Sequence, residues 1–193
     1  MLPQTGFVST SCMSQAEFEE WCERDIPSSL YRCELIGGYV VMEPPAGYAH
    51  SEIASRLGRL LGSFVDEMRL GKVFESSVGF ELPTGDTLSP DVSFVSNEHL
   101  ARVADQDPRR YVRAIPDLVV EVLSPSTAPR DRTDKRAIYE HSGVREYWLV
   151  DWEAHTITQV LFEQAREQTL SGTDILQCAV LKGLAIGIER VFA

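Results

Sequence analysis

The residues best suited to chemistry are two carboxylates and a lysine that lie in otherwise apolar segments. Glu121 interrupts the run Asp117-Leu-Val-Val-Glu-Val-Leu-Ser124, whose β-branched and leucine residues predict an inner β-strand. An unpaired, ionised carboxylate in a dry interior is costly or takes up a proton. Glu121 therefore needs a metal ion or a buried lysine as a partner, unless this strand ends in water.

Asp91 is the second candidate acid. It opens the segment Asp91-Val-Ser-Phe-Val95, in which strand alternation places Asp91 on the face opposite Val92 and Phe94. If this strand lies beside the strand of Glu121, the two carboxylates converge. Two such acids repel each other unless a divalent cation lies between them, and Mg²⁺ is commonly held by one or two carboxylates.

The spacing of Lys135 and His50 predicts that both point inward. Ile138, Tyr139 and Ser142 follow Lys135 at helical intervals, so the lysine shares the buried stripe of its helix. The alternative is a lysine that extends to solvent at the helix start. His50 precedes Ile53 by three residues and is expected on the core side of a helix start, either near a metal or bonded to the backbone.

The remaining patterns predict an α/β fold of the α+β type, a mixed β-sheet flanked by helices. Helices are expected at 15–24, 51–69 (ended by Gly71) and 131–142 (ended by Gly143). Strands are expected at 31–36 and 39–42 as a hairpin, at 72–82, 89–96, 145–151 and 156–162, and in a last hairpin or edge strands near the C-terminus. Residues 97–114 read as a polar connection.

Composition sets the broad class of the protein. At 193 residues, with 44% apolar and 24% charged residues, we expect a loose leader over 1–13, or an alternative start at Met13, and a single domain over 14–193. No run is long enough to span a membrane, and no signal peptide is recognisable. The four cysteines lack metal-ligand spacing, which favours reduced thiols and a cytoplasmic location and leaves a disulfide open.

Charge and missing motifs narrow the function. The formal net charge of −11 argues against a general nucleic-acid binder, because such binding rests largely on neutralising phosphates. No GxSxG, P-loop or GxGxxG is present, which excludes serine hydrolases, P-loop nucleotidases and dinucleotide enzymes as first choices. The four histidines form no spaced pair, so zinc is not expected.

Four segments together resemble the Uma-type endonucleases, a once-uncharacterised family within the PD-(D/E)XK nuclease superfamily. They are Glu34-Leu-Ile-Gly-Gly38, Ser89-Pro-Asp-Val92, Pro116-Asp-Leu-Val-Val-Glu-Val-Leu-Ser-Pro-Ser126, and the stretch from Lys135 through Gly143-Val-Arg-Glu-Tyr-Trp-Leu-Val-Asp151. The resemblance runs from about residue 15 to the C-terminal strands.

The resemblance implies a restriction-endonuclease-like core that binds Mg²⁺, with Mn²⁺ as a substitute, and cleaves phosphodiester bonds of nucleic acid. It favours DNA as the substrate and leaves RNA open. It also makes a homodimer reasonable. Asp91 matches the aspartate of the PD motif, Glu121 the second acid, and Glu34 an N-terminal acid. The implied metal ligands are therefore Asp91, Glu121 and Glu34, with His50 in a supporting position.

One position departs from the superfamily pattern. The superfamily's lysine would fall at Leu123, and the helix that follows supplies Lys135 instead. The implied catalytic set is Asp91, Glu121 and Lys135. The rival hypothesis is a catalytically inactive nuclease-fold module that binds nucleic acid or protein, and both the net charge and Leu123 favour it.

Overall fold

The centre of the protein is a six-stranded mixed β-sheet. The computed structural model describes residues 7–25, 32–43 and 45–193. Within them the sheet has the order β11-β10-β9-β8-β7-β4, in which β8 and β9 run parallel and the other neighbours antiparallel. The strands are β4 (Gly71–Glu75), β7 (Val92–Ser96), β8 (Leu118–Val122), β9 (Glu146–Asp151), β10 (Thr156–Leu161) and β11 (Arg166–Ser171).

Strand β8 lies in the interior of this sheet, as its apolar sequence predicts. It pairs with β7 on one side and β9 on the other, and all five of its residues are buried. Val120 and Val122 belong to the core on one face, whereas Val119 and Leu123 belong to the core on the other. Glu121 therefore points into the second face by strand alternation.

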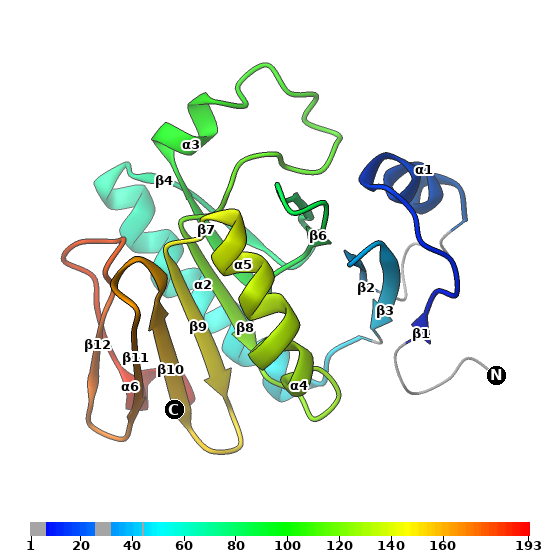
Figure 1. The fold of residues 1–193 in the computed structure, drawn as a ribbon. Coiled ribbons are helices and arrows are strands. Elements are labelled where there is room, and N and C mark those ends of the chain that lie inside the picture. Colours follow the sequence, from blue (N-terminus) through cyan, green and yellow to red (C-terminus); the bar gives the residue numbers. More distant parts are fainter. Residues whose placement is uncertain (1–6, 26–31, 44) are drawn as a thin grey trace.

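Helix α2 (Tyr48–Met68) covers the first face (Figure 1), with Ile53, Leu57, Leu61 and Val65 buried. It begins three residues before the predicted start, and the prediction that Gly71 ends it is wrong. Arg69 ends the helix in the left-handed conformation, and its N–H donates to the carbonyls of Val65 and Asp66. Gly71 instead begins β4, where a Cβ would lie 2.1 Å from the Val95 carbonyl oxygen.

A helix with a π-helical turn covers the second face (Figure 1). It comprises α4 (Ala128–Arg130), the π-helical turn η1 (Asp131–Lys135) and α5 (Arg136–Ser142). It begins three residues before the predicted start, because Pro129 is tolerated in a first helical turn. The predicted end is confirmed, since Gly143 caps the helix with a φ of 91°.

A second sheet packs beside the first and has the order β1-β3-β2-β6-β5. Its strands are β1 (Phe7–Val8), β2 (Arg32–Ile36), β3 (Tyr39–Glu43), β5 (Phe80–Glu81) and β6 (Thr87–Leu88). The predicted hairpin is confirmed as β2–β3, except for Tyr31, which lies outside the described residues. The single strand predicted over 72–82 is wrong, because β4 and β5 belong to different sheets. The strand predicted over 89–96 begins only at Val92.

The N-terminal segment contributes to this second sheet. Helix α1 (Gln15–Asp25) packs there, with Phe18 in a small core beside Leu35 and Val40. Val8 pairs with Val41 of β3, so part of the expected leader is hydrogen-bonded. Residues 1–6 lie outside the described residues, and the division of the chain at residue 13 stays a prediction.

The C-terminal part completes the first core. Strands β12 (Ile175–Gln177) and β13 (Ala185–Gly187) form the expected last hairpin, followed by α6 (Ile188–Phe192). The short 3-10 helix η2 (Phe162–Gln164) connects β10 to β11, and the connection over 97–114 contains the short helix α3 (Asn97–Ala101). No helix in the described ranges is long and apolar enough to cross a membrane.

Candidate functional site

The fold brings Asp91 and Glu121 to neighbouring positions. Val92 pairs with Val120 in the antiparallel register of β7 and β8, so the next step of that register sets Asp91 beside Glu121. The main-chain N–H of Val122 donates to Oδ2 of Asp91 at 2.7 Å, which ties the two strand ends together. Both acids are almost fully buried. The interpretation of Glu121 as a strand end in water is therefore wrong.

Asp91 is held by two basic side chains. Arg32 of β2 donates to Oδ1 at 2.7 Å, and Nε2 of His50, in the first turn of α2, lies 3.1 Å from Oδ2. Burial would raise the pKa of Asp91, but the hydrogen bond from His50 and the charge of Arg32 outweigh it and lower that pKa to about 2. His50 is thus bonded to a carboxylate of the site rather than to the backbone.

Lys135 lies at the centre of the other acids. Its Nζ is 3.0 Å from Oε2 of Glu34, 3.1 Å from Oε1 of Glu121 and 3.5 Å from Oδ1 of Asp131. The side chain is fully buried, so the alternative of a lysine extended to solvent is wrong. Burial opposes the charged form, but the carboxylates outweigh it and raise the pKa of Lys135. The amine stays protonated and is not available as a general base.

Two of the three acids next to Lys135 hold their protons more strongly than usual. Burial outweighs the attraction of Lys135 and raises the pKa of Glu121 well above its usual range. Burial likewise raises the pKa of Asp131. The hydroxyl of Tyr139 donates to Oε1 of Glu121 at 2.8 Å and stabilises it. A further cation at this place would relieve the cost of these buried charges.

Sequence reasoning missed four members of this cluster, although two of them carried a signal. Arg32 lies two residues before Glu34 on the same face of β2, and Asp131 lies four residues before Lys135 on the same face of its helix. Glu43 accepts hydrogen bonds from Arg32 at 2.6 Å and from Arg130 at 3.1 Å. No local pattern identifies Glu43 and Arg130, because their contact depends on how the two sheets pack.

A groove of about 770 Å³ opens onto one side of the cluster. Arg32, Glu43, His50 and Asp91 line it at the cluster, and one side of α2, strand β4 and the turn after β8 form its walls. Ser124 lines the groove and also shares hydrogen bonds with Ser126 and Thr127. Glu121, Glu34 and Lys135 lie behind this lining, so Asp91 is the predicted acid that a ligand in the groove would meet first.

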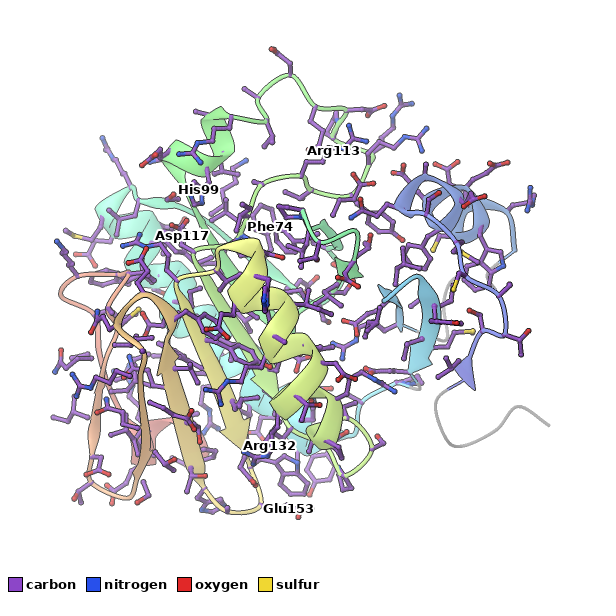
Figure 2. The ribbon with its side chains drawn as sticks, in the orientation of Figure 1. Phe74, His99, Arg113, Asp117, Arg132 and Glu153 are labelled. Carbon is purple, nitrogen blue, oxygen red and sulfur yellow. The ribbon has the colours of Figure 1, made fainter. Side chains whose placement is uncertain are left out.

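Other buried residues outside the cluster are structural. Tyr147 and Trp148 are fully buried in the core. Asp117 accepts from the N–H of Ser96 at 2.8 Å and lies 3.2 Å from Nδ1 of His99. Figure 2 shows Asp117 and His99 at the end of the sheet opposite Arg132, a neighbour of Asp131 in η1. All four cysteines are free thiols.

The donor types and charge of the cluster suit a divalent cation. Carboxylate oxygens are the ligands that Mg²⁺ and Mn²⁺ prefer. Five acids in the ion-pair network face three permanently charged side chains, so full ionisation of the acids leaves an excess of two negative charges when His50 is neutral. In addition, Oε2 of Glu34 and Oδ1 of Asp131 are buried and accept no hydrogen bond within the described residues, although both contact Lys135.

The predicted ligands nevertheless do not surround one point. Over residues 7–25, 32–43 and 45–193, no three His, Cys, Asp or Glu side chains are gathered as a ready metal site. The ammonium of Lys135 contacts both Glu34 and Glu121, whereas Asp91 is bonded to Arg32 and His50. The expected repulsion between the acids is therefore relieved by protein cations, and a metal ion would have to replace some of these ion pairs.

Comparison with known proteins identifies the family and the fold of the chain. Residues 15–189 match the Uma2 family, described as "Putative restriction endonuclease". A crystal structure from Anabaena variabilis, described as a "putative nuclease belonging to DUF820", is similar with a TM-score of 0.71 and 19% identity over 83% of this chain and 89% of that chain. No curated protein sequence matches. The structural likeness confirms the predicted restriction-endonuclease-like fold, and the extent of the family match shows that the chain belongs to the Uma2 family.

Proposed function

We propose that the protein is a metal-dependent endonuclease that hydrolyses phosphodiester bonds in DNA. One observation carries the proposal: two buried carboxylates, Asp91 directly before β7 and Glu121 in β8, lie at neighbouring positions, and Asp91 lines a groove. The description of the family as endonucleases agrees with it. The buried charge of Lys135 beside Glu121 completes the set of residues expected for this chemistry.

Each residue has a physical role in the proposed site. Asp91 and Glu121 would hold the ion, Mg²⁺ with Mn²⁺ as a substitute, and Glu34 would support it. The ion supplies Lewis-acid activation of water and of a phosphoryl oxygen. His50 and the Val122 N–H orient Asp91, and Tyr139 orients Glu121. Lys135 keeps the acids together and offsets charge that develops on the phosphate.

The proposal includes a cytoplasmic location, a homodimer and DNA binding at the groove. Free thiols agree with a reducing cytoplasm, and the resemblance implies a homodimer, which light scattering on the purified protein measures directly. The acidic overall charge requires that DNA binding be local to the groove, where Arg32 and Arg59 supply positive charge.

The test is cleavage of plasmid, linear and single-stranded DNA, and of RNA, with Mg²⁺ or Mn²⁺ and with EDTA. Asp91→Ala and Glu121→Ala should each lower metal-dependent cleavage by about 100-fold or more, since even residues that orient metal ligands contribute about 10–100-fold. Cleavage that survives both substitutions would refute the proposed site. Asp117→Ala is the matched control for loss of a buried acid away from the groove.

The second candidate function is a catalytically inactive module that binds nucleic acid or protein. The observation in its favour is that protein cations already satisfy every acid of the predicted set. Calorimetric titration with Mn²⁺ separates the two candidates, because an inactive module would show no binding that depends on Asp91 and Glu121.

A further inference from the structure

Tyr48 is an aromatic side chain that the fold does not use. It is the first residue of α2, and 88% of its surface is exposed. The other large apolar side chains that are exposed in the described chain are at most 57% exposed. An open aromatic ring contributes no core packing, so its packing within the chain does not account for this residue.

The position of Tyr48 relates it to the proposed active site. Tyr48 itself does not line the groove, but its neighbours Gly47, His50 and Ser51 do, and His50 contacts Asp91. The helical backbone fixes the Cβ of Tyr48 within one turn of the contact between His50 and Asp91. The same turn has no side-chain cap at Gly47, so its first N–H groups are open to a phosphate.

We propose that Tyr48 stacks on an unpaired nucleobase of a strand whose phosphates lie in the groove near Arg32 and Arg59, and that it makes the protein prefer single-stranded over double-stranded DNA. This inference rests on the proposed function and adds a substrate class to it. An aromatic ring recognises any base through its π face. In a duplex, neighbouring base pairs cover those faces, so the ring finds its partner in an unpaired strand.

The experiment measures binding without cleavage. Fluorescence anisotropy of a labelled oligothymidylate and of a duplex of equal length is recorded in EDTA with the full chain. Tyr48→Ala should weaken binding of the single strand by about tenfold to a hundredfold, the range found when an aromatic that stacks on a base is removed, and should change duplex binding much less. Tyr48→Phe and Tyr48→Trp should retain the affinity, because both keep an aromatic ring.

The control is Tyr39→Ala, which removes an exposed tyrosine from β3 whose neighbours Gly38 and Val40 do not line the groove; it should leave both affinities unchanged. With Tyr48→Trp, quenching of the added indole fluorescence by the oligonucleotide reports stacking directly. Equal affinity of Tyr48→Ala and wild type would overturn the inference, as would an equal loss for duplex and single strand. The proposed function fails differently, through metal-dependent cleavage that is absent or survives loss of Asp91 and Glu121.

Discussion

At the scale of single residues, the ammonium of Lys135 keeps three buried acids close together. Removing one partner of a buried ion pair costs about 3–5 kcal/mol, because the remaining charge is left uncompensated. Lys135→Met should therefore lower the free energy of unfolding by about that amount at pH 7, measured by urea denaturation. Lys72→Met, which removes an exposed lysine of β4, is the control and should change stability little.

The loss should be smaller at pH 5 than at pH 7. Burial raises the pKa of Glu121 and of Asp131 in the folded protein, and Lys135 opposes that rise, so its removal raises both further. A folded state with raised pKa values binds more protons than the unfolded chain, and its stability falls as pH increases above the unfolded values. A loss that is equal at both pH values would show that the charge of Lys135 is not the cause.

The sequence reveals the residues of the site better than their partners. The apolar neighbours of Glu121 require a buried partner for it, and the helical spacing of Lys135 identifies that partner. The pairing of Asp91 with Arg32 and His50 could not be predicted, because it joins a strand of the second sheet and a helix start to β7. The expected arrangement of Asp91, Glu121 and Glu34 around one ion included His50 in support but omitted Arg32.

At the scale of elements, α2 contains glycines that its packing does not require. Gly58 and Gly62 lie inside the helix, and a Cβ at either position would meet no atom within 4 Å. Glycine in a helix interior costs about 0.5–1 kcal/mol relative to alanine. The double variant Gly58→Ala, Gly62→Ala should therefore be about 1–2 kcal/mol more stable than wild type in urea denaturation.

Gly71→Ala provides the contrast. There a Cβ would lie 2.1 Å from the Val95 carbonyl oxygen, so β4 and β7 would have to separate and the protein should be destabilised. A double variant at Gly58 and Gly62 that is less stable than wild type would mean that α2 packs more closely against the rest of the chain than the structure shows.

Local sequence patterns predicted the helices and strands that bury their residues at regular intervals. The periodicity of α2 and the apolar run of β8 suffice, because each element buries one regular face. The π-helical turn over Asp131–Lys135 has no such signal, since it depends on where the helix packs against β8 and β9. The split of the segment 72–82 between two sheets likewise follows from tertiary packing. The ring of Tyr111 lies so close to Gly79 that a Cβ at this position would be 2.5 Å from the ring.

At the scale of the whole molecule, buried charges join the two sheets. Arg32, Glu34 and Glu43 come from the second sheet, and they meet Asp91 at the start of β7 and Lys135 and Arg130 on the helix that covers the first sheet. The packing of the two sheets thus depends on charge balance. Full ionisation of the five acids leaves an excess of two negative charges when His50 is neutral. A bound divalent cation would balance that excess and should therefore stabilise the entire fold.

Thermal unfolding measures this coupling. At a tenfold excess of Mg²⁺ or Mn²⁺ over its dissociation constant, binding to the folded state adds about 1.4 kcal/mol, which for a chain of this length raises the melting temperature by about 3–6 °C. Sodium chloride at equal ionic strength should not reproduce the shift, because screening acts on exposed charges. Asp91→Asn combined with Glu121→Gln should abolish it. A shift of equal size in this double variant would show that the cation binds elsewhere and would separate the charge cluster from metal binding altogether.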